Sequence, residues 1–252
     1  MKKQISVILT MLFLFNLTVF AEGESSSKYS DFDISKYPFV DKYNIVNGYD
    51  DGTFRPEINI TRAEFLKILM GERAISKELS ENTPNEDINF SDVSNTHWAY
   101  DEIKEAVNAG IVNGYEDGTF RPDDNITFEQ GIKMTLSMLG YAPLAEMYGG
   151  YPTGYMAIGY NTRFFKAAGS TLDWENCSVE NMNEEKQKSY MTRRDVVAFA
   201  ERAFLTPICY VLRTDTNWDG SHSVAVSIGG EDTVVKTIYS TSGAVTVVEE
   251  NN

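Results

Sequence analysis

The amino-acid sequence predicts a mainly α-helical protein made of three helix–loop–helix repeats, with a small β-rich tail. Residues 45–61 and 111–127 are near copies of each other, and a weaker third copy follows from residue 191. Self-similarity at a constant spacing is the sequence signature of a repeat array. The tail is predicted because β-branched residues alternate with small polar residues after Phe204.

Each copy contains a signal for the start of a helix. A threonine is followed three residues later by an acid or a glutamine, so each side chain can bond the backbone N–H of the other residue in a capping box. The pairs are Thr61 with Glu64, Thr127 with Gln130, and Thr192 with Asp195. Apolar residues at helical spacing follow each pair. Gly71 and Gly140 are predicted to end the first two helices.

A tight turn precedes the first two of these helices. Asp51-Gly52 and Asp117-Gly118 each supply a glycine that permits positive φ, and the phenylalanine of the following Phe-Arg-Pro sequence is predicted to enter the core. The arginines of these sequences, Arg55 and Arg121, are expected to tie the turn to a neighbouring acid. In the third copy the turn is replaced by the polar segment 170–190, which is predicted to be a loop.

A leading helix is predicted before each turn. It is clear in the second copy, where apolar residues recur at helical spacing from Trp98 and Gly110 ends the run. In the first copy only residues 35–43 remain for such a helix, and Pro38 lies inside them. The first repeat is therefore expected to be shortened and the third to be divergent.

These residues resemble the S-layer homology family, a cell-wall-anchoring module normally present as three tandem copies. The resemblance rests on Ile60-Thr61-Arg62-Ala63-Glu64, on His97-Trp98-Ala99, and on the Asn-Gly-Tyr and Phe-Arg-Pro sequences of both turns. It implies three repeats that associate around a pseudo-threefold axis into a spindle, with ligand grooves between adjacent repeats. It also implies a non-catalytic protein that binds a secondary cell-wall polysaccharide attached to peptidoglycan.

The patterns divide the chain into segments. The predicted units are a signal peptide at 1–21, a linker at 22–28, repeat one at 29–72, a linker at 73–89, repeat two at 90–141, repeat three at 142–205 and the β-rich tail at 206–252.

The amino terminus has the layout of a secretory signal peptide, in which Lys2 and Lys3 precede an apolar run. The alternative is an uncleaved membrane anchor, but the run is short for a span and contains Asn16 and Thr18. Secretion to the cell wall or cell surface is therefore expected, with no transmembrane span.

Composition limits the partners. The 252 residues carry a formal net charge of −15, so nucleic acid, itself a polyanion, is not expected as a partner. An anionic ligand must instead be held by a local arginine site. The two cysteines, Cys177 and Cys209, are too few for a disulfide framework, and a single bridge between them stays open.

Arg62 and Arg193 are the main candidates for ligand binding. Each follows a helix N-cap, where a cation opposes the helix dipole, so its presence indicates a function; a solvent-facing arginine is the alternative. The resemblance implies that this arginine contacts the ketal-pyruvate carboxylate on the terminal sugar of the polymer. A guanidinium can bind a carboxylate through two charge-assisted hydrogen bonds. Phe128 stands at this position in the second copy, so that repeat lacks the group.

Four further residues are candidates on the resemblance. It implies that Trp98 forms a groove wall and that Asp92 accepts hydrogen bonds from sugar hydroxyls, with Tyr155 and Asp31 as their counterparts in other copies. The alternative for Trp98 is a place in the core, the commoner fate of tryptophan. The alternative for Asp92 is to accept backbone hydrogen bonds in a turn.

No metal site, cofactor or catalytic group is predicted. Asp215 to Gly220 resembles the first half of a calcium loop, but the twelfth position falls on Val226, which cannot ligate, so a hairpin turn is predicted. The histidines are limited to His97 and His222, and no serine or cysteine lies in a recognisable nucleophile motif.

The predicted function is therefore an exported, non-catalytic cell-wall anchor. One alternative is a structural or interaction subunit of the cell surface, whose grooves have decayed and whose tail binds another surface protein. The other is a wall-hydrolysing enzyme, which would need only two carboxylates in a cleft.

Overall fold

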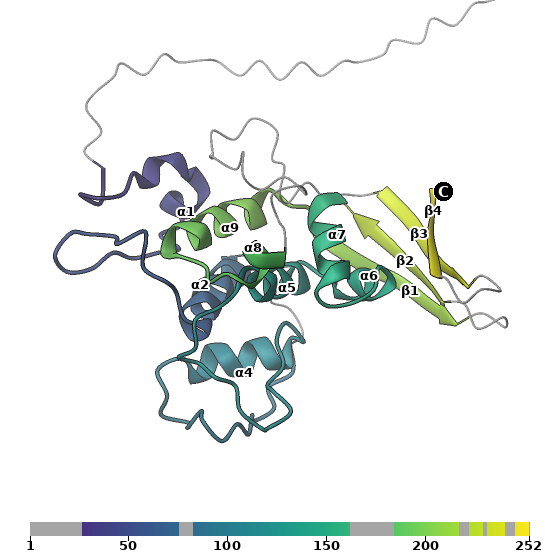
Figure 1. The fold of residues 1–252 in the computed structure, drawn as a ribbon, viewed down its shortest axis with the longest axis horizontal. Helices are drawn as coiled ribbons and strands as arrows, with labels where there is room; N and C mark the ends of the chain where they lie inside the picture. The colour runs from purple at the N-terminus through teal and green to yellow at the C-terminus, as the bar shows by residue number, and fades with distance from the viewer. Residues whose placement is uncertain are drawn as a thin grey trace, which may run out of the picture.

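The computed structural model describes residues 27–75, 83–161, 184–216, 222–228, 231–239 and 245–251. The described chain is mainly helical, with an antiparallel sheet at its carboxyl end (Figure 1). Its helices are η1 (Ile34–Lys36), α1 (Pro38–Lys42), α2 (Arg62–Ile75), α4 (Tyr100–Asn108), α5 (Phe128–Met138), α6 (Ala142–Met147), α7 (Thr153–Asn161), α8 (Glu184–Lys188) and α9 (Arg193–Leu205). Its strands are β1 (Cys209–Thr216), β2 (His222–Ile228), β3 (Glu231–Tyr239) and β4 (Val245–Asn251). The predicted signal peptide and Cys177 lie outside the described residues.

The three predicted capping boxes are present, at the starts of α2, α5 and α9. Thr61 N donates to Glu64 Oε2 at 2.9 Å, and Glu64 N donates to the Thr61 hydroxyl oxygen at 3.2 Å. Thr127 with Gln130 and Thr192 with Asp195 form the same reciprocal pair. Each box satisfies N–H groups that the first helical turn leaves without a partner, so neighbouring residues determine where these helices begin.

The helix ends follow the sequence less closely. Gly140 has a φ of 86° just after α5, in agreement with its predicted role as a stop. The predicted stop at Gly71 is wrong, because α2 continues through this residue to Ile75. Pro38 does not interrupt the first leading helix but opens α1, where a proline has no helical N–H bond to lose. The segment 170–190 is not entirely a loop, since it contains α8.

A closed ring of backbone hydrogen bonds joins the three copies. Ile60 N donates to Met191 O at 3.0 Å, Met191 N donates to Ile126 O at 2.9 Å, and Ile126 N donates to Ile60 O at 3.1 Å. Each of these residues directly precedes the threonine of a capping box, and each side chain is fully buried. The starts of α2, α5 and α9 therefore meet around one point, although they lie far apart in the sequence.

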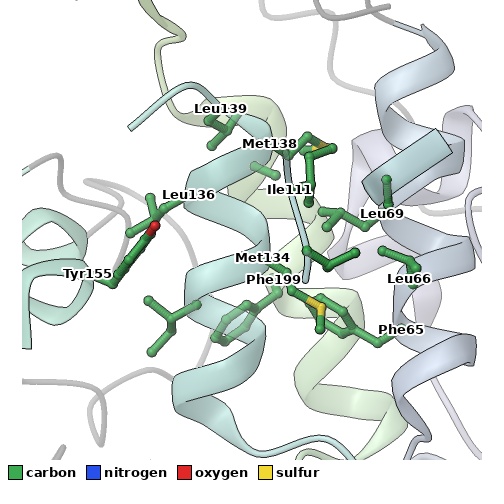
Figure 2. Packing of buried hydrophobic residues seen from close by; sticks show 14 of the residues in the cluster. Phe65, Leu66, Leu69, Ile111, Met134, Leu136, Met138, Leu139, Tyr155 and Phe199 are labelled. Carbon is green, nitrogen blue, oxygen red and sulfur yellow. The ribbon is translucent and has the colours of Figure 1, made fainter. Parts of the chain in front are cut away.

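The main core lies between these three helices. Figure 2 shows apolar side chains from α2, α5 and α9 meeting there, among them Phe65, Leu69, Met134 and Phe199. The phenylalanines of the two turns, Phe54 and Phe120, are also buried, as predicted. Burial of one such large apolar side chain stabilises a fold by roughly 1.5–3 kcal/mol. Packing in this core thus holds together helices that lie far apart along the chain.

The two turns have the same construction. Arg55 Nη2 bonds an Asp51 oxygen at 2.8 Å, and Arg121 Nη2 bonds an Asp117 oxygen at 2.8 Å, so the predicted ties to a neighbouring acid are confirmed. Both arginine side chains are 43% exposed, and exposed ion pairs of this kind contribute about 0–1 kcal/mol to stability. These arginines therefore shape the turns more than they stabilise the fold.

The tail forms an antiparallel sheet with strand order β1-β2-β3-β4. It is joined to the repeats, because Cys209 N donates to Leu139 O at 2.8 Å and the Tyr141 hydroxyl donates to Pro207 O at 2.7 Å. Strands β1 and β2 pair across the segment 217–221, and Val226 lies fully buried in β2. The predicted turn at Asp215 to Gly220 falls mostly on residues 217–221, which lie outside the described residues. Within the described residues, no helix combines the length and the apolar character needed to cross a membrane.

Candidate functional site

Two surface grooves are related by the repeat. The first groove has a volume of about 500 Å³ and is lined by the turn of repeat one, by α2, by Trp98 and by Arg193. The second groove has a volume of about 140 Å³ and is lined by the turn of repeat two, by α5, by Tyr151 and by Arg62. Equivalent positions of the two copies line them, as in Asn47 with Asn113, Glu64 with Gln130, Lys67 with Lys133, and Ile68 with Met134.

Each groove takes its arginine from a different repeat. In the first groove, Arg193 Nε donates to Phe54 O at 2.9 Å, and its Nη2 donates to Asn47 O at 2.7 Å. In the second groove, Arg62 Nη2 donates to Asn113 O at 2.9 Å. The arginine of the first groove therefore comes from repeat three and contacts the turn of repeat one. The arginine of the second groove comes from repeat one and contacts the turn of repeat two.

Arg62 is a buried cation with unused donors. It is 7% exposed, and its buried Nε has no hydrogen-bond partner, whereas the Nε of Arg193 donates to a turn carbonyl. The Arg62 guanidinium lies over the Phe120 ring at 4.6 Å and the Tyr115 ring at 5.4 Å. These rings stabilise the cation but cannot neutralise it. Burial lowers the pKa of Arg62, because desolvation disfavours the charged form.

Lys133 brings a second cation into the second groove. Its pKa is lowered, first by burial and then by the nearby charge of Arg62. In the described part of the chain neither Arg62 nor Lys133 makes an ion pair with a carboxylate. The first groove differs, because Lys67 Nζ lies 2.9 Å from Glu102 Oε1. The carboxylates of Asp124 and Glu146 lie near enough to oppose part of the pKa lowering of Arg62 and Lys133, respectively, but neither forms a direct ion pair with these cations. An anion entering the second groove would therefore meet two positive charges without a direct carboxylate partner.

An aromatic residue stands at the side of each groove. Trp98 is 52% exposed and Lys67 Nζ lies 5.5 Å from its ring, so this side chain is not in the core. Tyr151 is 43% exposed and has Lys133 Nζ at 5.5 Å from its ring. The expected counterpart of Trp98, Tyr155, is instead 3% exposed, and its hydroxyl lies 3.3 Å from the Ser137 hydroxyl (Figure 2). Tyr151, not Tyr155, thus occupies the place of Trp98 in the second groove.

Asp92 and Asp31 hold the turns. Asp92 accepts hydrogen bonds from Phe120 N at 2.8 Å and Arg121 N at 2.7 Å. Asp31 accepts from Phe54 N at 2.6 Å and from Arg55 N at 2.9 Å, and the first of these bonds lowers the pKa of Asp31 most. Neither aspartate lines a groove. The structure therefore gives both residues the backbone-accepting role that was the alternative for Asp92, while a contact with sugar hydroxyls stays a prediction.

Replacement of Asp92 by alanine should lower the melting temperature by a few degrees. The Phe120 and Arg121 N–H groups would lose their acceptor, and ~1 kcal/mol corresponds to about 2–4 °C in a protein of this size. Asp92→Asn, which keeps one acceptor oxygen, should fall between the parent and alanine in thermal melts. An unchanged melting temperature for Asp92→Ala, together with lost polymer binding, would assign Asp92 to the ligand instead.

The third position of this pattern is apolar. Phe128, which replaces the arginine, is 1% exposed and meets the Phe199 ring edge-on at a centroid distance of 6.0 Å. Its backbone N donates to Ser189 O at 3.1 Å, so it faces repeat three. The position of Lys67 and Lys133 is taken in α9 by Ala198, which is 5% exposed. Phe128 therefore takes the position from which an arginine of repeat two would face repeat three, so the arginine is lacking where these two repeats meet. The groove at the turn of repeat two keeps a cation, because its arginine, Arg62, comes from repeat one.

The grooves contain residues that sequence reasoning missed. Lys67, Lys133 and Tyr151 were not among the predicted site residues. The two lysines carried a signal, because each follows its capping-box threonine at the same distance. Tyr151 carried none, since its segment has a different pattern from the one around Trp98.

Comparisons with known proteins follow the same segments. Residues 41–66 and 89–130 match the family model of the S-layer homology domain. Cell surface glycoprotein 1 of Acetivibrio thermocellus is 41% identical over 98 residues, which are 37% of this chain and 4% of that protein. The cellulosome-anchoring protein of the same organism is 36% identical over 94 residues, which are 37% of this chain and 21% of that protein. An endoglucanase of a Bacillus species is 33% identical over 152 residues, which are 56% of this chain and 15% of that protein.

The chain spans about a fifth or less of the length of each of these relatives. The matched segments include the turns of both grooves, together with Arg62 and Trp98. Two segments of the chain, residues 41–66 and 89–130, therefore match the S-layer homology domain.

Proposed function

We propose that the protein is an exported, non-catalytic anchor of the cell surface that binds a pyruvylated secondary polysaccharide of the cell wall. The observation that carries the proposal is the meeting of Arg62 and Lys133 in the second groove without a carboxylate partner. The chain has a net charge of −15, so carboxylates are plentiful elsewhere. Two desolvated cations held together cost free energy, and a bound anion would offset that cost.

The form of the groove suits a carboxylate on a sugar. Arg62 offers a planar set of N–H donors, and Nη1 donates to no group in the described part of the chain. Tyr151 presents an aromatic side chain beside this donor set, which suits contact with a sugar ring. A pyruvate ketal combines the two features, since it places a carboxylate directly on a sugar.

The first groove is proposed as a second, weaker site. It is larger and has Trp98 as its aromatic wall, but Glu102 already neutralises part of its positive charge through Lys67. Arg193 also has two of its nitrogens bonded to turn carbonyls. The anion should therefore gain less there than in the second groove.

The proposed frame is a pseudo-threefold spindle of repeats 29–72, 90–141 and 142–205. The closed ring through Ile60, Ile126 and Met191 supports it, because three equivalent segments each donate to the next. Each groove then lies where one repeat meets its neighbour. The apolar residues Phe128 and Ala198 leave two cationic grooves among the described residues.

The remaining parts of the proposal concern export and assembly. We assign residues 1–21 to a cleaved signal peptide and 206–252 to a tail that is available to a surface-protein partner. The names of the relatives, a cell surface glycoprotein and a cellulosome-anchoring protein, agree with a role at the cell surface. The endoglucanase aligns over only 15% of its length, so its activity is not carried over to this chain.

A binding experiment with cell walls tests the proposed function. The purified protein should sediment with intact walls, stay in solution with walls stripped of their secondary polysaccharide, and be displaced by excess free polymer. Equal binding to intact and stripped walls would overturn polysaccharide recognition. Release of reducing sugars from the walls would overturn the non-catalytic assignment.

A further inference from the structure

A buried carboxylate lies near the end of α2 without a hydrogen-bond partner. Glu72 is 5% exposed, and its Oε2 is inaccessible and unbonded in the described part of the chain. The equivalent residues of the other two helices are Met138 and Ala203, both apolar. The neighbouring Arg73 is engaged elsewhere, with Glu105 and with the Thr83 hydroxyl. A buried acceptor left without a donor is costly, so the position is a candidate for a ligand.

Glu72 is one of the residues that line a cavity of about 260 Å³ at the carboxyl ends of the three core helices. Three aromatic rings line it. The Phe204 ring stacks on Phe39 at a centroid distance of 5.7 Å and on Tyr43 at 5.4 Å, with an angle of 18° between the planes in both pairs. Met138 and Thr206 also contribute to the lining. The cavity therefore offers an apolar, aromatic surface, and Glu72 is the one acidic residue among the described residues that line it.

The electrostatic setting favours a positive charge. Helices α2, α5 and α9 end at Ile75, Met138 and Leu205, and residues of all three ends line the cavity. The carboxyl end of a helix carries a partial negative charge. No lysine or arginine is among the described residues that line this cavity. Aromatic rings add further attraction for a cation.

We propose that this cavity binds a small organic ammonium ion, with Glu72 accepting a hydrogen bond from its N–H and the rings of Phe39, Tyr43 and Phe204 surrounding its apolar body. A primary amine on a compact apolar stem has the required chemistry. A metal ion does not fit as well, because it needs several oxygen ligands, and the described residues hold no group of three side chains that could bind one. The site lies apart from both cationic grooves, so the proposal does not depend on the polysaccharide function.

Binding should be coupled to the protonation of Glu72. Burial, and secondarily the charge of Glu201, raise the pKa of Glu72 well above its ordinary value, so the neutral acid persists in the empty site to a higher pH than in an exposed glutamate. Glu201 lies on α9 and accepts hydrogen bonds from Phe39 N and Val40 N. Among the described residues that line the cavity, Tyr43 is the titratable group besides Glu72. When an ammonium ion binds, Glu72 loses its proton to solvent and the ion pair forms. Affinity should therefore rise with pH until Glu72 is ionised in the empty site.

Titration with benzylamine, and with benzyl alcohol as its neutral counterpart, tests this proposal. The parent protein should bind benzylamine at least tenfold more tightly than benzyl alcohol, and calorimetry in two buffers should detect proton release. Glu72→Gln keeps the size of the side chain but cannot ionise, so it should lose both the preference and the proton release. Benzyl alcohol affinity and wall binding should not change in this variant.

Glu72→Met provides a control for folding, because it copies the residue that α5 carries at the equivalent position. It should remove the preference for benzylamine and raise the melting temperature, since no buried carboxylate remains. The proposal is overturned if the parent protein binds the two compounds equally. It is also overturned if either variant keeps the parent's preference for benzylamine.

Discussion

Arg62→Ala should weaken binding of the pyruvylated wall polymer by roughly ten- to a hundredfold. A hydrogen bond to a charged group contributes about 1.5–3 kcal/mol, and each 1.4 kcal/mol is a factor of about ten in affinity. The buried Arg62 has an unused Nη1 and no carboxylate partner in the described part of the chain, so the ligand carboxylate would supply what the protein lacks. Calorimetric titration with purified polymer measures the effect.

Alanine substitutions of two other arginines should weaken polymer binding less than Arg62→Ala does. Arg193→Ala should weaken binding less, because Glu102 already compensates Lys67 in the first groove. Arg121→Ala is the matched control: Arg121 lies over the same Tyr115 ring, but it is exposed and paired with Asp117. Loss of such an exposed pair costs about 0–1 kcal/mol, so affinity should fall by less than about fivefold.

Arg62→Lys separates charge from shape. Lysine keeps the positive charge but not the planar fork of donors, so its affinity should lie between those of the parent and Arg62→Ala. Melting curves of all variants distinguish lost contacts from lost structure. Binding by Arg62→Ala at the level of the parent, with a normal melting temperature, would contradict the carboxylate site.

Phe128→Ala should destabilise the fold by about 3–5 kcal/mol and leave polymer affinity almost unchanged. The ring is 1% exposed and packs on Phe199 between α5 and α9, so its removal leaves a cavity in the core. No guanidinium is lost, and neither groove is lined by Phe128. Urea denaturation measures the free energy of unfolding, and the same sample can be titrated with polymer.

Phe128→Leu is the control for this change. It keeps most of the apolar volume and should cost clearly less than alanine, because the cavity is smaller. If Phe128→Ala stays folded but loses polymer binding, while Arg62→Ala keeps it, Phe128 and not Arg62 would mark the ligand site. The proposal that Arg62 marks the stronger site, in the second groove, and Arg193 the weaker site, in the first groove, would then be wrong.

Local structure was largely readable from neighbouring residues. The capping boxes at Thr61, Thr127 and Thr192, and the acid ties of the turn arginines, involve residues three or four positions apart. Such local contacts depend little on the rest of the fold, so the residue types alone predict them. The failure at Gly71 has the opposite cause, because α2 runs on beyond this glycine while its buried face packs on the core.

The site was readable only in part. Arg62, Arg193 and Trp98 were predicted and line the grooves, but Lys133 and Tyr151 were missed. Asp92 accepts hydrogen bonds from the N–H groups of Phe120 and Arg121, which lie almost thirty residues away in the sequence. A residue type alone does not reveal such a partner, because the choice among distant partners depends on how the repeats pack.

The sequence by itself determined where three core helices start with the same capping device, and which residues could bind an anion. The tertiary structure alone decided which unit each arginine serves. The ring through Ile60, Ile126 and Met191 places each helix start against the turn side of another repeat, so Arg62 reaches Asn113 and Arg193 reaches Asn47. It also decided that Glu72 is buried beside a cavity while its equivalents are apolar. Both outcomes depend on packing between distant segments, which capping, periodicity and charge along one stretch of chain do not encode.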